Sequence, residues 1–121
     1  MEEVVITLSH PVSALRPNGR AHWAVKYRAA KNARHTAAVF MRCAMHELGL
    51  KRGEWVPTRY RVEWCYKGSR PDADNCLASC KAYLDGCADA LGIDDRQLEC
   101  AGIERVHDKR LAGLVMLVFM P

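Results

Sequence analysis

The sequence has no long apolar run. None of its segments approaches the about 18 consecutive apolar residues that a transmembrane helix needs. Its first residues include Glu2 and Glu3 and show no basic segment followed by apolar residues, so a secretory signal is not expected. We therefore expect a soluble, cytoplasmic protein with no membrane partner. The 121 residues, 50% of them hydrophobic, suit a single domain over residues 1–121 with one core.

Cysteine pairs with metal-ligand spacing are also missing. The chain has six cysteines, but disulfide frameworks belong to secreted proteins. Cys76, Cys80, Cys87 and Cys100 do not form the C-x-x-C pairs that make a zinc site recognisable. We expect reduced cysteines that are buried as small apolar side chains, with a zinc site as the alternative.

Acidic residues are absent from a long stretch near the start of the chain. Between Val4 and His46 there are seven Lys or Arg residues and no Asp or Glu. From Asp72 to Glu104 the balance reverses, with eight acidic residues against two basic ones. A basic region suits a polyanion and an acidic region suits a cation, so the pattern favours metal-dependent chemistry on nucleic acid. An ordinary surface of mixed charge is the alternative.

Helix-breaking residues are missing over residues 21–48, which predicts a long helix that ends at Gly49. A second helix is predicted over residues 74–91, ending at Gly92. Strands are predicted over residues 4–8, 58–66, 98–106 and 114–120, with a bulge at Gly102. We expect a small α+β domain in the order strand, helix, strand, helix, strand, strand, with a mixed sheet packed against two helices.

The segment with the candidate catalytic residues follows the strand predicted over residues 58–66. Asp72 and Asp74 are two residues apart in an extended segment, so their carboxylates point the same way and can bind one cation such as Mg²⁺. Asp94 or Asp95 would supply a third carboxylate. On the predicted helix Lys81 shares a face with Asp74, where an ammonium group can neutralise charge that develops on a phosphate.

A structural interpretation of the same residues stays open. Asp and Asn are preferred at helix starts, so Asp72 to Asn75 can serve as a cap alone. Lys81 and Asp85 are four residues apart and can form a surface ion pair. The residue pattern by itself does not decide between these roles and metal binding.

Three motifs, taken in order, carry a resemblance to a known family. They are Asp72-x-Asp74-Asn75, Lys81-x-x-x-Asp85-Gly86 and Gly92-Ile93-Asp94-Asp95. This pattern resembles the RusA family of Holliday junction resolvases, which includes crossover junction endodeoxyribonucleases encoded by phages and prophages. The resemblance covers nearly the whole chain, and it implies the RusA-like form of the expected fold.

The resemblance implies specific roles for the acidic residues. Asp72, Asp74 and Asp95 would be catalytic and would hold Mg²⁺, and Lys81 would be the catalytic lysine. Lys81 departs from the family spacing, because five residues separate it from Asn75 where the best-known members have two. The resemblance also implies a homodimer and a location in the cytoplasm of a bacterial or phage-infected cell.

The predicted function is a structure-selective endodeoxyribonuclease. It would resolve four-way DNA junctions by Mg²⁺-dependent phosphodiester hydrolysis in DNA recombination and repair. Its partner would be branched DNA, whose phosphates basic residues contact without reading sequence. The residues predicted to bind DNA are Arg16, Arg20, Lys26, Lys31, Arg34, Lys67 and Arg70. A non-catalytic nucleic-acid-binding module and a nuclease for other branched DNA are the alternatives.

Overall fold

The computed structural model describes residues 3–17 and 20–121, so residues 18 and 19 of the basic loop lie outside the described part. The chain forms one small α+β domain with a four-stranded sheet and three α-helices. The strands are β1 (Val4–Ser9), β2 (Arg59–Tyr66), β3 (Glu99–His107) and β4 (Leu114–Met120). The helices are α1 (Trp23–Glu47), α2 (Ala73–Ser79), α3 (Lys81–Leu91) and two short 3-10 turns, η1 (Ser13–Leu15) and η2 (Asp95–Gln97). None of the helices in these residues has the length and apolar character needed to cross a bilayer.

The sheet is mixed, as the sequence predicts. Its strand order is β1-β4-β2-β3, with β2 and β3 parallel and the other neighbours antiparallel. Tyr60 pairs with Cys100 and Arg61 pairs with Gly102, so Ala101 is the extra residue of a bulge beside the predicted position. The parallel pair requires a crossover, which α2 and α3 provide.

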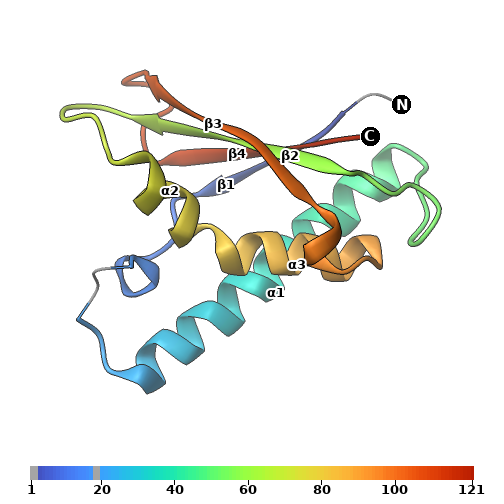
Figure 1. Cartoon of the computed structure of the whole chain (residues 1–121), viewed down its shortest axis with the longest axis horizontal. Helices are drawn as coiled ribbons and strands as arrows, with labels where there is room; N and C mark the ends of the chain where they lie inside the picture. The colour runs from blue at the N-terminus through green and yellow to red at the C-terminus, as the bar shows by residue number, and fades with distance from the viewer. Residues whose placement is uncertain (1–2, 18–19) are drawn as a thin grey trace.

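The core lies between the sheet and the helices, which all cover the same face of the sheet (Figure 1). Strand β1 alternates buried and exposed residues, and Val4, Ile6 and Leu8 point into the core. Leu117 and Phe119 of the central strand β4 are fully buried. This single apolar layer places the start of α2, the start of α3 and the loop after β1 at the rim of the domain.

Helix α1 is buried over only its second half. Its buried residues are Ala37, Ala38, Met41 and Met45, and the first buried position comes fourteen residues after the helix begins at Trp23. In the first half, Trp23 and Tyr27 are 73% and 64% exposed. The amino-terminal part of α1 therefore projects from the domain (Figure 1).

The predicted second helix is wrong as a continuous element, because it divides into α2 and α3 at Cys80. The Ser79 hydroxyl donates a hydrogen bond to the Cys76 carbonyl at 2.9 Å. The Cys80 amide instead donates to the Leu77 carbonyl at 3.1 Å, which is the tighter 3-10 pattern. Three helices, rather than two, therefore pack on the sheet. The expectation that Lys81 shares a helix face with Asp74 holds only for a continuous helix, so it no longer applies.

Burial is confirmed for three of the four cysteines considered from the sequence, but it is wrong for Cys100, which is exposed on β3. Cys76, Cys80 and Cys87 are buried, and Cys87 is fully enclosed. Burial raises the pKa of the Cys80 thiol to about 12, so the thiol remains protonated and unreactive at neutral pH.

Helices α1 and α3 approach closely at Gly86. A Cβ atom added at Gly86 would lie 2.0 Å from the Arg34 carbonyl oxygen and 3.1 Å from Ala37 Cβ. The first of these atoms belongs to the backbone of α1, which cannot move aside without shifting the helix. Glycine at this position therefore sets the distance between the two helices.

We predict that Gly86→Ala lowers the free energy of unfolding by about 1–3 kcal/mol, because the new methyl group overpacks the contact between α1 and α3. Helix propensity alone predicts the opposite sign, a gain of about 1 kcal/mol for the same change. Urea unfolding of both proteins measures the difference. An unchanged or higher midpoint would show that the helices are not held at this distance.

Candidate active site

Helix α2 begins with the first acidic motif. The Asp72 side chain is the N-cap and accepts a hydrogen bond from the Asn75 amide at 3.1 Å. Asp74 lies in the first turn and is exposed. Both carboxylates are at the positive end of the helix, so the capping role that the sequence left open is confirmed for Asp72.

Lys81 is the first residue of α3 and joins two acidic residues. Its Nζ donates to Asp95 Oδ2 at 3.0 Å and to Asp85 Oδ1 at 3.1 Å. The hydrogen bond to Asp95, and next the one to Asp85, raises the pKa of Lys81. Since 69% of the Lys81 side chain is exposed, its charge remains accessible to a ligand in solvent. The structure thus brings together Lys81 and the second aspartate of the Asp94–Asp95 pair.

The neighbouring residue Asp94 has a different partner. Its side chain accepts from the Arg96 amide at 2.9 Å and forms an ion pair with the Arg96 guanidinium at 2.9 Å. The Asp94 amide donates to the Gln97 side chain, which completes a capping box at η2. The hydrogen bonds from Arg96 hold the pKa of Asp94 well below its usual range. Asp94 therefore closes a turn, whereas Asp95 contacts Lys81.

The three predicted metal ligands do not form one group. Lys81, Asp85 and Asp95 line a hollow of about 390 Å³, whereas Asp72 lines a separate cavity of about 290 Å³. Asp74 lines neither of them. Within residues 3–17 and 20–121, no three His, Cys, Asp or Glu side chains are arranged to hold a metal ion. Asp72 and Asp74 lie at the start of α2, whereas Lys81 follows the end of that helix. The predicted set of metal ligands therefore stays a prediction.

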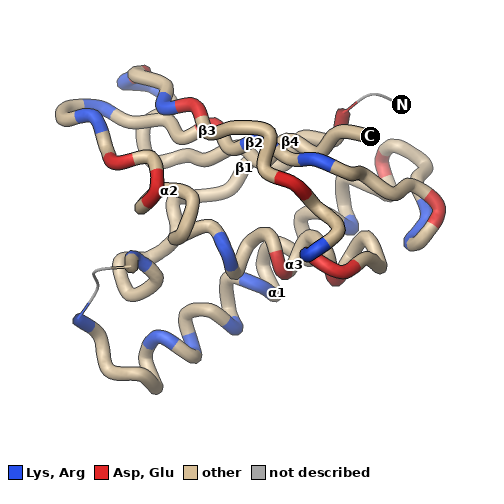
Figure 2. Tube along the Cα trace, viewed as in Figure 1, with Lys and Arg blue, Asp and Glu red and all other residues tan. Residues whose placement is uncertain are grey.

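Most of the predicted DNA-binding residues lie before the acidic segment in the chain, but Arg16 lines the same cavity as Asp72 and Arg34 lines the hollow of Asp85 and Asp95. Lys and Arg follow the loop before α1 and the first part of α1, and acidic residues mark the start of α2 and the region of α3 and η2 (Figure 2). Arg16 and Arg20 are exposed in the loop, and Lys67 and Arg70 are exposed between β2 and α2. Lys31 is exposed on α1, and Lys26 is half-buried there.

Arg34 has an internal partner among these basic residues. Its Nε and Nη2 donate to the two carboxylate oxygens of Asp89 at 2.6 and 2.8 Å. The bidentate pair links α1 to α3 and lowers the pKa of Asp89 through the Arg34 hydrogen bonds. The donors that Arg34 would offer a phosphate are therefore shared with this carboxylate.

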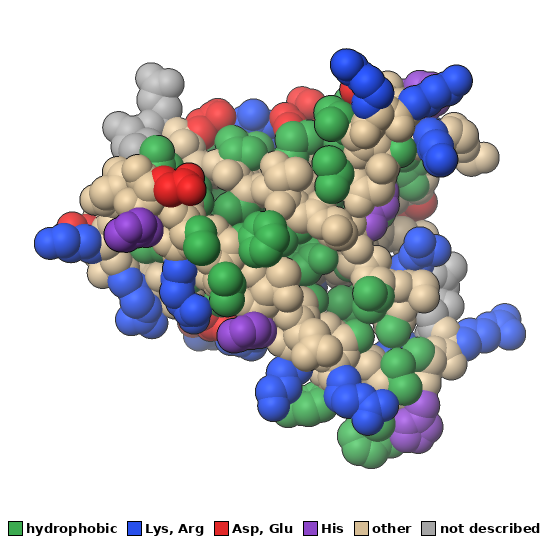
Figure 3. Space-filling view, turned by 180° about the vertical axis from the view of Figure 1, so that it is seen from behind, with side chains coloured by type: hydrophobic (Ala, Val, Ile, Leu, Met, Phe, Trp, Pro, Cys, Tyr) green, Lys and Arg blue, Asp and Glu red, His purple; other side chains and the backbone are tan. Residues whose placement is uncertain are grey.

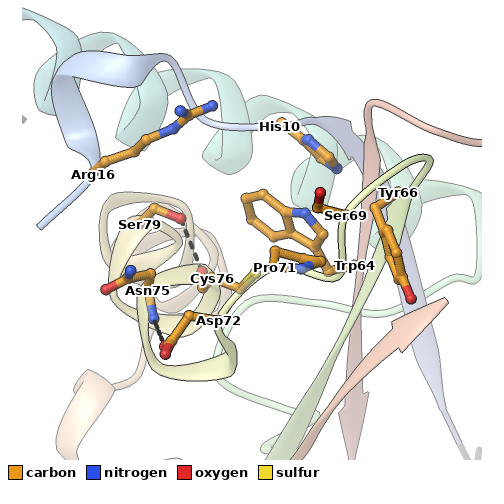
Figure 4. A pocket seen from close by; sticks show the side chains of 10 residues that line it. All are labelled: His10, Arg16, Trp64, Tyr66, Ser69, Pro71, Asp72, Asn75, Cys76 and Ser79. Carbon is orange, nitrogen blue, oxygen red and sulfur yellow. Dashed lines mark hydrogen bonds between the residues drawn. The ribbon is translucent and has the colours of Figure 1, made fainter. Parts of the chain in front are cut away.

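Several residues at the Asp72 cavity were not predicted as functional from the sequence. His10 stacks on Trp64 with ring centroids 4.0 Å apart, and Tyr66 lies two residues further along β2 (Figure 4). Arg105 of β3 donates from Nη1 to the Pro71 carbonyl at 3.0 Å and holds the segment before Asp72. The period-two pattern of β2 places Trp64 and Tyr66 on one face, but the register that brings Arg105 beside Trp64 is a long-range pairing that no local pattern encodes.

Comparisons with known proteins leave the family open. The chain matches no protein-family model. It is 43% identical over 97 residues to an uncharacterized protein of Xylella fastidiosa (strain Temecula1), across 76% of this chain and 60% of that protein. The chain thus spans less than two thirds of the length of this relative. A solved structure of Plasmodium falciparum IspF in complex with CDP aligns over 69% of this chain and 53% of its own, with 14% identity and a TM-score of 0.33, a likeness too low to carry an argument.

We predict that Asp89→Asn lowers stability at neutral pH by less than about 1 kcal/mol, because the Arg34–Asp89 pair is half exposed to solvent. The folded state lowers the pKa of Asp89, so this contribution is present above the unfolded-state pKa and is lost as the pH falls through the folded-state pKa. Chemical unfolding from about pH 7 to below about pH 4 measures the loss. A difference between the two proteins that persists in acid would contradict an ionic origin.

Proposed function

We propose that the protein is a RusA-like endonuclease that cuts branched DNA, with four-way junctions as its substrate. The observation that carries this proposal is the contact of Lys81 with Asp95. The resemblance in sequence assigns a catalytic role to both residues, and they are separated by fourteen positions yet lie 3.0 Å apart. The neighbouring Asp94 points to Arg96 instead, which agrees with the family's use of the second aspartate.

The charge distribution supports a DNA substrate. A basic loop and helix start, together with Lys67 and Arg70, precede the acidic residues in sequence (Figure 2). Cations of this kind position a phosphate backbone without reading its sequence, which suits selection of a branch by shape.

The proposal includes a homodimer, and the exposed start of α1 is a candidate surface for its interface. Trp23 and Tyr27 are largely exposed on the projecting part of α1. Figure 3 shows hydrophobic and basic side chains together at the end of the molecule where this part of α1 lies. A second copy that covered the two rings would remove apolar surface from water, and a twofold axis would present two sites to symmetry-related strands of a junction.

The proposal includes Mg²⁺ because the candidate ligand side chains are carboxylates. Carboxylate oxygens are the ligands that Mg²⁺ takes, and Asp72, Asp74 and Asp95 would hold it. In the described arrangement they are not gathered, since Asp95 is bonded to Lys81 and Asp72 accepts the Asn75 amide. A bound Mg²⁺ supplies an activated water and a polarised phosphate.

A second candidate function is a non-catalytic nucleic-acid-binding module. Its support is that Asp72 caps α2 and Asp94 caps η2, so local structure accounts for two of the five acids in the family pattern. The basic surface would then bind DNA without any chemistry. A nuclease for other branched DNA differs only in substrate.

Nicking of a synthetic four-way junction in Mg²⁺ tests the proposal, beside a flap and a linear duplex of the same sequence. We expect the wild-type protein to nick the junction, and Asp72→Asn and Asp74→Asn to bind it without nicking. Asparagine keeps the size and the capping capacity of aspartate but removes the charge. Junction binding without nicking by the wild-type protein, across several divalent ions, would favour the binding module. Faster nicking of the flap would favour the other branched substrate.

The adjacent aspartates form a matched pair of variants. We predict that Asp95→Asn lowers the single-turnover nicking rate by at least about a hundredfold, because its carboxylate lies at Lys81 in the site. Asp94→Asn is expected to change the rate by less than about threefold, because asparagine still caps η2. The reverse ranking would show that the turn after Gly92 supplies the other carboxylate.

Lys81 is predicted to act on the reaction and not on binding. Lys81→Ala should lower the nicking rate by roughly a hundredfold or more, while junction affinity falls little, because one phosphate contact among many contributes modestly to binding. Lys81→Arg should restore only part of the rate, since a planar guanidinium does not replace a compact ammonium. Single-turnover rates beside a binding titration separate the two effects. Unchanged rates for both variants would make Lys81 part of a surface ion pair only.

A further inference from the structure

The cavity beside Asp72 has the size of a site for one small ring. Its volume is about 290 Å³, just below the about 300–1,000 Å³ that ligand pockets span. It lies between the end of β2, the segment that leads into α2, and the loop after β1 (Figure 4). Asp72 and Arg16 of its lining have roles in the proposed function, whereas Trp64, Tyr66, Asn75 and Ser79 have none.

One side of the cavity is aromatic and fixed in place. Trp64 is 8% exposed and stacks on His10, whose Nε2 donates to the Leu114 carbonyl at 3.0 Å. Tyr66 contacts His107 edge to face, with ring centroids 5.2 Å apart. Because these rings are held before a ligand arrives, a planar ligand that contacts them does not have to order them.

The opposite side is polar and carries one cation. Figure 4 shows Arg16, Ser79 and Asn75 across the cavity from the aromatic rings. Ser79 already donates its hydroxyl proton to the Cys76 carbonyl, so its oxygen is left as an acceptor. The Asn75 side chain offers both a donor and an acceptor. Burial lowers the pKa of His10 and the charge of Arg16 lowers it further, so the aromatic side is neutral and Arg16 supplies the positive charge.

We propose that this cavity binds a single unstacked nucleobase, with Trp64 and Tyr66 forming its aromatic wall, Asn75 and Ser79 bonding its polar edge, and Arg16 contacting the attached phosphate. A nucleobase is planar, carries donors and acceptors on its edge, and is linked to an anion, which matches the three parts of the lining. The base belongs to a DNA strand, and a free nucleotide is the other source of the same chemistry.

The statement that the base comes from DNA rests on the proposed function. Asp72 lines the cavity, so a base held there would lie beside the carboxylate that the family resemblance places at the reaction. Branch points expose bases that are easier to unstack than those of a duplex, and enzymes read such bases by stacking and edge hydrogen bonds. The cavity would thereby add a preference for one base to an enzyme that selects DNA by shape.

Titration of the ¹⁵N-labelled full chain with dAMP, dCMP, dGMP and dTMP tests the cavity without any need for activity. We expect at least one nucleotide to shift the Trp64 indole N–H and the Asn75 side-chain amide saturably, and to leave the indole signals of Trp23 and Trp55 in place. Asn75→Ala and Tyr66→Leu should each weaken this binding by at least about fivefold. Asn32→Ala, an exposed position on α1, is the matched control and should bind as the wild type does. Equal shifts at all three tryptophans, or none that saturate, would overturn the proposal.

A junction with one abasic nucleotide, placed in turn at each position around the branch, tests whether DNA supplies the base. We expect one abasic position to lower single-turnover nicking by at least about tenfold, and Tyr66→Leu to slow the intact junction but not that abasic one further. Equal nicking at every abasic position would contradict the proposal that a DNA strand supplies the base. Saturable shifts at Trp64 without nicking of any branched DNA would support the nucleobase site and contradict the proposed function alone.

Discussion

Helices α1 and α3 touch at Gly86, where the Arg34 carbonyl leaves no room for a side chain, and the position of α3 depends on this contact. The Arg34 side chain extends from the same turn to Asp89, so one residue of α1 holds α3 through its backbone and through its charge. With α3 fixed, Lys81 at its first turn lies within hydrogen-bond distance of Asp95 on η2. The candidate active site therefore depends on the packing of α1 against α3, the helix that supplies Lys81 and Asp85.

Much of the fold follows from patterns that are local in the sequence. The absence of Pro and Gly over residues 21–48 predicts α1, and alternation of side chains predicts β2. Strand ends lie within a residue or two of the predicted bounds. The break at Cys80 was not predicted, because helix propensity favours continuation there and the competing hydrogen bond of Ser79 depends on where its hydroxyl points. The strand order of the sheet is likewise a long-range property that short patterns do not encode.

The candidate site was predicted in part. Lys81 and Asp95 lie together, as the family resemblance implies, and Asp72 caps a helix, as the alternative implies. The cavity wall of His10, Trp64 and Tyr66 was missed, since it joins a loop after β1 to a strand more than fifty positions away. The internal partner of Arg34 was missed for the same reason, because the charge pattern of α1 alone does not reveal that Asp89 lies opposite. Pattern reasoning therefore identifies residue types and faces, and tertiary packing decides which of them meet.

The proposed function requires the carboxylates at the start of α2 and at η2, which are not gathered in the structure, to act on one cation. Paramagnetic broadening by Mn²⁺ tests it most directly, because Mn²⁺ takes oxygen ligands as Mg²⁺ does and broadens the NMR signals of nearby amides. We expect the amides of residues 72–75 and 93–96 to broaden together at the same low Mn²⁺ concentration, and Asp95→Asn to weaken the broadening in both segments. Broadening confined to one segment, or spread evenly over all acidic residues, would contradict a shared site.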